Sequence, residues 1–149
     1  VGGHAQAFGF TAKLNNIKEI VETINGSIAD NFVPDRFIKI DSVIGLKDIN
    51  LEFIKSLALL EPYGKSNEEP VFAVKKVKID SLSAFGNQGN HGKFVLSNTV
   101  QAVGWNMFDK MKYYFDQKKE IDIICKLENN EFQGKINPRI VVLDMDFSG

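Results

Sequence analysis

The residues closest to the start of the chain combine types that suit contact with a phosphate group. Gly2 and Gly3 allow a tight turn whose backbone N–H groups a phosphate can approach closely. The adjacent His4 imidazole can donate a hydrogen bond to a phosphate oxygen or orient one. The structural alternative is that the glycines only permit the turn and that His4 is buried with its hydrogen bonds satisfied. Gly2, Gly3 and His4 are candidate substrate contacts, but their residue types alone favour the structural alternative.

A second candidate site consists of basic side chains in the later part of the chain. Phosphate contacts made by lysine and arginine supply much of the affinity of proteins for nucleic acid, whereas a single surface lysine is ordinarily only solvated. The densest basic run, at residues 75–78, falls on a predicted strand. The residues selected as DNA-binding candidates are Lys75, Lys76, Lys78, Lys93, Lys135 and Arg139, and further candidates are Lys110, Lys112, Lys118, Lys119 and Lys126.

Aromatic side chains at strand ends or turns offer exposed rings on which the bases of a single strand can stack. Trp105 ends a predicted strand and is also selected as a DNA-binding residue, with burial against a predicted helix as the alternative. The other rings at strand ends or turns are Phe85, Tyr113 and Phe132, whereas those at core-like spacings are Phe94, Phe108, Phe115 and Phe147.

The residue types that hold metals are sparse. Cys125 is the only cysteine and lies in an apolar run, which excludes a disulfide framework or a cysteine zinc site within this chain and predicts a small buried side chain. His91 lies in a glycine-rich stretch and is expected to be a solvated loop residue. Asp144 and Asp146 alternate with apolar residues, which predicts the outer face of a strand. No metal site or cofactor is predicted within this chain.

The composition is that of a globular protein with a packed core, because 44% of the residues are hydrophobic and 25% are charged. Eighteen basic against nineteen acidic residues give a net charge of -1, so any contact with DNA must be a local patch. No segment approaches the roughly 20 apolar residues of a membrane span, and no signal peptide opens the chain. We expect a cytoplasmic protein without a membrane partner. The start at Val1 suggests a piece of a longer protein.

The first part of the chain alternates between helical and extended patterns. Apolar residues at helical spacing predict a helix over about 16–32, and a strand over 37–44 follows it. A second helix is predicted over 50–60. It ends at the turn cluster 62–64, which we interpret as the boundary between two modules.

Beyond that boundary the pattern changes to the period of two that is typical of strands. Three strands, one helix and two strands within about 80 residues, with a long first strand, are what an OB-fold barrel requires. A ferredoxin-like domain would place a helix after its first strand, where this sequence has a glycine-rich turn. The predicted strands are 71–85, 93–97, 99–105, 121–127 and 141–147, the helix spans about 107–115, and turns lie at 86–92 and 129–134.

Two short motifs resemble those of a known family. The opening GGHAQAFGFT (residues 2–11) resembles the glycine-glycine-histidine motif of the DHH-associated domain, in the form that RecJ-type single-stranded-DNA exonucleases carry. The linker LEPYGKSNEEPVF (residues 60–72) resembles their second signature, leucine-x-proline-phenylalanine-glycine followed by glycine-asparagine-proline-glutamate-proline-valine-phenylalanine. Phe8, Ser66 and Glu68 depart from the usual residues at a packing site and in the linker. With the elements around these motifs, the resemblance covers nearly the whole chain.

This resemblance implies the C-terminal part of an exonuclease that degrades single-stranded DNA from its 5′ end in DNA repair and recombination. The fold class implied is α+β. Residues 1–61 would be the end of a DHH-associated α/β module with a connecting helix, and 62–149 a five-stranded OB-fold barrel. Mn²⁺ or Mg²⁺ would be held by the parent's catalytic domain, whose aspartates and Asp-His-His triplet do not occur in this sequence.

By the same resemblance, Gly2, Gly3 and His4 would face the substrate phosphate, and the chain would bind single-stranded DNA without hydrolysing it. A single-stranded-DNA-binding protein and a helicase are the protein partners considered.

Two other functions stay open. The barrel could serve interdomain packing or recruit a partner protein, which the near-neutral net charge favours. The chain could also belong to a phosphodiesterase of short oligonucleotides or cyclic dinucleotides, which shares the glycine-glycine-histidine element but has neither the linker motif nor the OB-like tail. DNA affinity that falls with salt would separate the first function from the packing role.

Overall fold

The structure, a computed structural model, describes residues 2–4, 7–27 and 37–149, and side chains from residue 9 onward within these ranges. It divides into two compact units, Val1–Phe37 and Ile38–Gly149, each of which is treated by itself. Within the described ranges, no helix is long and apolar enough to cross a membrane.

The first unit holds a small hairpin and one helix. Strands β1 (Gly2–His4) and β2 (Ala7–Gly9) pair antiparallel, so the two glycines lie in extended backbone and not in the expected turn. A short 3₁₀ turn (Leu14–Asn16) leads into helix α1 (Ile17–Ser27), which begins where the apolar spacing predicts. The predicted continuation to residue 32 lies outside the described residues.

The second unit opens with short elements that precede the main sheet. Strand β3 (Ser42–Ile44) is shorter than the predicted strand over 37–44, because only these residues pair with a neighbour. A 3₁₀ turn (Leu46–Asp48) follows, in which the Asp48 carboxylate accepts a hydrogen bond from the Gly45 N–H at 2.9 Å.

Helix α2 (Leu51–Leu57) continues as a 3₁₀ turn over Ala58–Leu60 and matches the predicted second helix. Asn50 caps it, because its Oδ1 accepts a hydrogen bond from the Phe53 N–H at 2.9 Å. Within this helix Ile54 is in the core and Leu57 is half-buried, whereas Leu51 and Ala58 are exposed.

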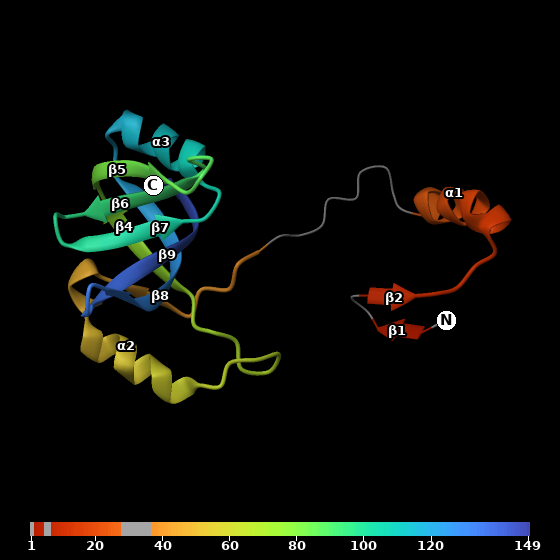
Figure 1. Ribbon diagram of the computed structural model, residues 1–149, viewed down its shortest axis with the longest axis horizontal. Helices are drawn as coiled ribbons and strands as arrows, with labels where there is room; N and C mark the ends of the chain where they lie inside the picture. The colour runs from red at the N-terminus through yellow and green to blue at the C-terminus, as the bar shows by residue number, and fades with distance from the viewer. Residues whose placement is uncertain (1, 5–6, 28–36) are drawn as a thin grey trace. The chain divides into compact units, whose positions relative to one another are not determined.

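A seven-stranded sheet forms the body of this unit, with the strand order β3-β4-β8-β9-β7-β6-β5 (Figure 1). The neighbours β3–β4 and β7–β9 are parallel, and the other pairs are antiparallel. Strands β4 and β5 lie near opposite ends of this order but follow each other in the chain with only Lys78 between them, so the sheet curls round. The elements are β4 (Phe72–Val77), β5 (Ile79–Phe85), β6 (His91–Leu96), β7 (Val100–Gly104), α3 (Phe108–Gln117), β8 (Ile121–Phe132) and β9 (Lys135–Phe147).

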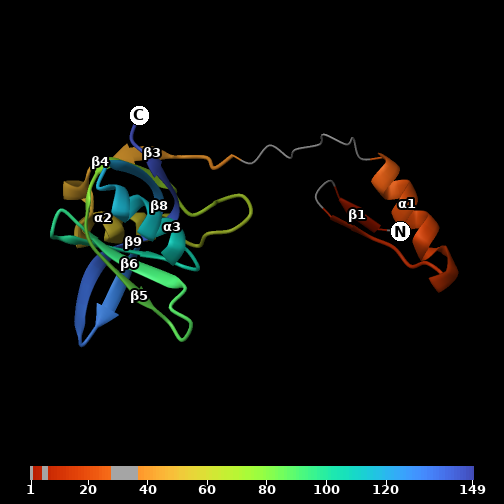
Figure 2. The same cartoon turned by 90° about the horizontal axis from the view of Figure 1, so that it is seen from above.

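The helix followed by two strands agrees with the prediction, but four strands lie between the turn cluster 62–64 and this helix where three are predicted, and the last hairpin also differs. The predicted strand over 71–85 is interrupted at Lys78, after a register shift between Val74 and Val77 that marks a bulge. The turn predicted over 129–134 is confined to Gln133 and Gly134, because β8 and β9 stay paired to the tip of their hairpin. Figure 2 shows this hairpin extending away from the rest of the sheet.

The core lies inside the curled sheet, with α3 over β5 and β6 and α2 beside β8 and β9 (Figure 1). Met111 of α3 is fully buried. A Cβ built on Gly92 would lie 2.1 Å from its Sδ, and one on Gly104 would lie 2.1 Å from its Cε, so the helix approaches where two strands carry glycine. Cys125 is buried as predicted, and burial raises the pKa of its thiol to about 12, so it stays protonated.

Candidate nucleic-acid interface

Three aromatic rings meet on the outer face of the β5–β6–β7 sheet, and we call them the ring platform: Phe85, His91 and Trp105. Phe85 ends β5, His91 begins β6, and Trp105 follows the last residue of β7. The His91 ring centroid lies 5.3 Å from that of Phe85 and 5.1 Å from that of Trp105, and the Phe85 and Trp105 centroids are 5.5 Å apart. Trp105 is 50% exposed, so part of its ring is available to a ligand.

Glycines place these rings on the outer face. Gly92 and Gly104 pair across β6 and β7 and face Met111 on the inner side. Because successive strand residues point to opposite faces, His91 and Trp105 then point outward. Gly86, at φ 86°, also has to be glycine, since a Cβ there would lie 2.7 Å from the His91 Cδ2.

His91 is therefore not the solvated loop residue that the sequence suggests. It begins a strand, is half-buried and contacts Phe85 at a tilted angle and Trp105 edge-on. Its Nδ1 accepts a hydrogen bond from the Asn106 N–H at 2.9 Å. In the neutral ring the proton is consequently on Nε2. The sequence places this histidine among glycines and asparagines, and nothing in that local pattern shows the two aromatic neighbours.

Lys93 supplies a cation on the same face as the ring platform. It lies two residues after His91 on β6, directly opposite Ser83 of β5 and Val103 of β7. Its side chain is exposed and forms no ion pair with any residue that the structure describes. An aromatic surface beside a free cation is the combination with which single-stranded nucleic acid is held.

The basic run on β4 lies at the bulge that interrupts the first long strand. Lys75, Lys76 and Lys78 are all exposed, and the Lys76 N–H donates to the Asp122 Oδ1 at 3.0 Å. The Ser148 hydroxyl also donates to that oxygen, at 2.5 Å. These two hydrogen bonds, helped by the charges of Lys75 and Lys76, hold the pKa of the Asp122 carboxyl below its ordinary value. Asp122 thus organises the bulge while the lysine side chains stay free.

Other basic candidates are already paired with acids. Arg139 donates from Nε to the Glu128 Oε1 at 2.7 Å and from Nη2 to the same oxygen, and its side chain is only 22% exposed. Lys135 is exposed near the tip of the β8–β9 hairpin, opposite Phe132. The remaining paired candidates are Lys126 with Glu69, Lys112 with Asp116, and Lys110 with Asp144.

Comparison with known proteins decides which family this arrangement belongs to. The family described as RecJ OB domain matches residues 40–144, which is more than half of the chain. The chain belongs to the RecJ OB domain family. The predicted resemblance to RecJ-type nucleases is thereby confirmed.

The similar proteins are much longer than this chain. It is 26% identical over 152 residues to the single-stranded-DNA-specific exonuclease RecJ of Bacillus subtilis, covering 96% of this chain and 19% of that protein. It is also 26% identical to a putative single-strand DNA-specific exonuclease of Bacillus phage SPbeta, covering 98% of this chain and 26% of that protein. The chain therefore spans about a fifth to a quarter of the length of the curated relatives it matches.

A solved relative shows the same fold. The crystal structure of RecJ in complex with Mn²⁺ from Thermus thermophilus superposes with a TM-score of 0.80 at 23% identity, covering 99% of this chain and 22% of that one. The RecJ OB domain seen here thus has the arrangement of strands found in that protein.

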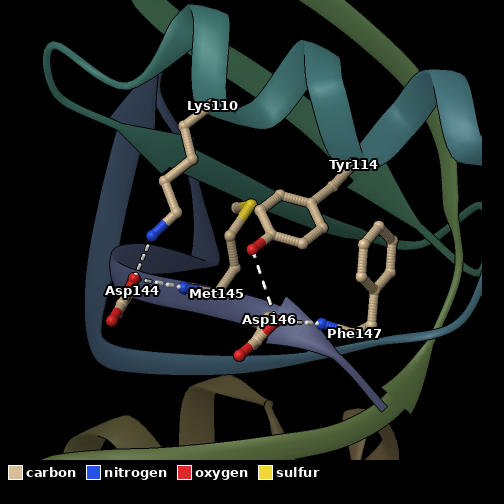
Figure 3. A network of polar contacts seen from close by, with 6 residues as sticks. All are labelled: Lys110, Tyr114, Asp144, Met145, Asp146 and Phe147. Carbon is tan, nitrogen blue, oxygen red and sulfur yellow. Dashed lines mark hydrogen bonds and ion pairs between the residues drawn. The ribbon is translucent and has the colours of Figure 1, made fainter.

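Two acids of this RecJ OB domain tie β9 to α3 (Figure 3). The Asp144 Oδ1 accepts hydrogen bonds from the Lys110 Nζ and, at 2.8 Å, from the Met145 N–H, and the Lys110 contact is the larger cause that holds the Asp144 pKa below its ordinary value. The Tyr114 hydroxyl donates to the Asp146 Oδ1 at 3.4 Å. Burial, and then the charge of Asp146, raise the pKa of Tyr114. Asp144 is half-buried and Asp146 is exposed, whereas Met145 between them is buried, so both acids lie outside the core as their alternation with apolar residues predicts.

The structure does not test the role of the predicted N-terminal contacts. The backbone of Gly2, Gly3 and His4 forms β1, but the His4 side chain lies outside the described side chains. Their contact with substrate phosphate stays a prediction. Among the residues that the structure does describe, no group of three or more histidine, cysteine, aspartate and glutamate side chains is placed to hold a metal ion.

Proposed function

We propose that residues 38–149 hold single-stranded DNA for a RecJ-type exonuclease, with bases on the ring platform and phosphates against Lys93. The half-exposed Trp105, packed against His91 and beside an unpaired lysine on one face, carries this proposal. Family membership supports it, because the relatives are named for action on single-stranded DNA. Stacking of one base on an aromatic ring contributes about 1–3 kcal/mol, which is enough to make one exposed tryptophan measurable.

The finer fold assignments belong to the same proposal. We count β4 and β5 as one bent strand, so that with β6, β7, β8 and β9 they make the five strands of an OB barrel, and β3 is an addition at its edge. Residues 1–61 are the end of a DHH-associated module, and a module boundary follows Glu61. The parent acts in the cytoplasm from the 5′ end of the strand, in repair and recombination.

Catalysis belongs to the rest of the parent protein in this proposal. Mn²⁺ or Mg²⁺ would supply the charge that activates water and stabilises the phosphate being cleaved. The described residues of this chain include no side-chain group that fits such an ion, so this chain alone should not hydrolyse DNA. Gly2, Gly3 and His4 would orient the substrate phosphate from the side opposite the metal.

Fluorescence anisotropy of a 5′-phosphorylated, labelled oligothymidine, measured at several salt concentrations, tests the DNA-holding role. We expect Trp105→Ala to weaken binding about tenfold or more, because one stacked base is lost. We expect Lys93→Ala to reduce the slope of log K against log salt by about 0.7, the value for one phosphate contact on a single strand.

Matched controls are available in the same chain. Phe37 is an aromatic residue that is 85% exposed outside the sheet, and Lys47 is an exposed lysine outside the β5–β6–β7 face. Phe37→Ala and Lys47→Ala should leave both affinity and salt slope unchanged. Equal losses of affinity in the test and control variants, or no DNA binding by the unaltered chain, would show that the ring platform does not bind DNA.

A second candidate function is docking of β3 against another part of the parent polypeptide. β3 is an edge strand, and the apolar side chains of Ile38, Ile40 and Val43 are 43%, 41% and 60% exposed on and before it. Val43→Lys should leave unfolding of this chain unchanged but lower the melting temperature of the full-length parent. The same melting temperature for both full-length proteins would exclude this edge as a packing surface.

A further inference from the structure

We propose that the lysines around the C-terminal end of α3 form a phosphate-binding pocket separate from the ring platform. The pocket has a volume of about 270 Å³, and Lys78, Lys118 and Lys119 line it together with the rings of Tyr114 and Phe115. Compact ammonium groups are suited to phosphate oxygens, to which each can donate several hydrogen bonds.

The fold brings two separate basic segments to this place. Val77 of β4 is directly opposite Ile121 of β8, and Ile121 is directly opposite Phe147 of β9. Lysines 75, 76 and 78 flank Val77, while lysines 118 and 119 precede Ile121. Strand pairing therefore brings the two basic segments to one row of paired residues, although about 40 positions separate them in the sequence.

None of these five lysines forms an ion pair with a described residue. The acid that lines the pocket, Asp80, accepts the Asn98 N–H at 2.6 Å, and Asp122 is held by Ser148 and the Lys76 N–H. The Lys119 ammonium lies 5.4 Å above the ring of Phe147. Five lysine charges therefore stand against these two carboxylates, and an anion in the pocket would relieve the remaining repulsion between the lysines.

The backbone gives independent support. Lys76 and Lys118 have φ values of 55° and 54°, in the left-handed region that costs any residue with a Cβ and favours glycine or asparagine. Most of the other described residues in that region are glycine or asparagine, as at Gly86, Gly134 and Asn98. Lys118 lines the pocket, and Lys76 lies two residues before the lining residue Lys78. Two lysines kept in unfavourable backbone conformations in and next to one pocket point to a use for their side chains.

Attraction to the helix dipole is the alternative explanation for part of this cluster. Cations near the end of a helix are stabilised by its exposed carbonyl groups, which applies to Lys118 and Lys119 after α3. It does not apply to Lys76, which lies at the bulge within β4, or to Lys78, which follows that strand. A phosphate ligand accounts for both segments.

The phosphate could belong to a DNA strand or to a small free phosphate compound. In the first case the pocket rests on the proposed function and extends the DNA path beyond the ring platform. The two sources can be separated with two probes, inorganic pyrophosphate and the labelled oligothymidine, against this whole chain.

The double variant Lys76→Gly/Lys118→Gly is the decisive test, because glycine relieves the backbone strain and removes the charge of one lysine that lines the pocket and of one that lies two residues before the lining residue Lys78. We expect its melting temperature to equal or exceed that of the unaltered chain. We expect the rise in melting temperature with pyrophosphate, measured against chloride at equal ionic strength, to disappear. For DNA, the salt slope should fall by about 1.4, which is about 0.7 for each of two contacts.

Gln133→Gly is the matched control, since Gln133 has φ 51° at the hairpin tip and carries no charge. This variant should change neither the rise in melting temperature with pyrophosphate nor the salt slope of oligothymidine binding. Loss of the pyrophosphate effect with an unchanged DNA slope assigns the pocket to a free phosphate compound, and a reduced DNA slope assigns it to the strand. Full retention of both effects by the double variant would overturn the proposal. Unchanged DNA affinity of the Trp105→Ala variant would count against the ring platform but not against this pocket.

Discussion

At the scale of single residues, one close contact decides how the ring platform is held. Met111 fills the space over Gly92 and Gly104, whose added Cβ atoms would each lie 2.1 Å from its side chain. Met111 is fully buried, so it has little room to move aside. The orientation of His91 and Trp105 therefore depends on two glycines that make no contact with a ligand.

We expect Gly104→Ala to lower the free energy of unfolding by about 1–3 kcal/mol, because a methyl group overpacks a filled core. In a Met111→Ala background the same substitution should cost much less, since the space is then open. Urea denaturation of the four proteins of this cycle measures the coupling. Gly64→Ala, where a Cβ would meet nothing within 4 Å, is the control and should be nearly neutral. Additive losses would show that Met111 does not set this contact.

The sequence predicts the exposure of single residues better than it predicts which residues lie next to each other in space. The exposed lysines on β4 are recognisable by residue type, whereas the sequence leaves open whether Trp105, which is half-exposed, is buried against the helix. His91 was misplaced among loop residues, since its neighbours Phe85 and Trp105 are brought to it only by strand pairing. The ion pair of Arg139 with Glu128 likewise needs the β8–β9 register, which a sequence pattern does not specify.

At the scale of elements, the Lys110–Asp144 pair fastens α3 to β9 (Figure 3). Asp144 has a lowered pKa in the folded chain, so its ionised form is favoured by folding. The resulting stability is present above the ordinary carboxyl pKa of 3.8 and is lost as the pH falls through the lowered native value. Both side chains are more than two-fifths exposed, so solvent screening keeps the contribution small.

We expect Asp144→Asn to lower the free energy of unfolding at neutral pH by at most about 1 kcal/mol. The difference from the unaltered chain should shrink as the pH is lowered below 3.8, because the native carboxylate then becomes protonated too. Urea denaturation at a series of pH values measures this. Asp116→Asn, which breaks the Lys112 pair within α3 alone, is the control and should have a smaller effect. An Asp144→Asn difference that is constant with pH would contradict the ion-pair explanation.

The sequence predicts helices and strands whose apolar residues repeat at a regular spacing. It does not predict strand segments that are exposed to solvent on both faces. Helix α2 and the first turns of α1 follow the apolar spacing. The outer part of the β8–β9 hairpin is polar and exposed on both faces, so Asn129 and Asn130 read as a turn although they are paired. The sequence pattern also does not predict the interruption of the strand at Lys78, because a bulge changes the pairing register without changing the residue types.

At the scale of the whole molecule, the packed core belongs to residues 38–149. Helix α1 contains no buried residue, whereas Ile49 and Ile54, before the predicted module boundary after Glu61, are 5% and 7% exposed within the core. The sequence motif marks residues 60–72 as a linker, but a linker motif does not tell where core contacts stop. The two criteria place the start of the independently folding unit at different residues, and expression of fragments separates them.

We expect the fragment 38–149 to unfold cooperatively with the same midpoint as the main transition of the whole chain, and the fragment 62–149 to be strongly destabilised. Removing Ile49 and Ile54 forfeits about 1.5–3 kcal/mol for each buried side chain, a large share of a typical domain stability of about 5–15 kcal/mol. Urea denaturation followed by circular dichroism measures both fragments. Ile54→Ala within 38–149 is the matched control, and should lose about 2–5 kcal/mol without loss of the fold. If 62–149 is instead as stable as 38–149, the barrel is complete without α2, and the boundary read from the linker motif is the physical one.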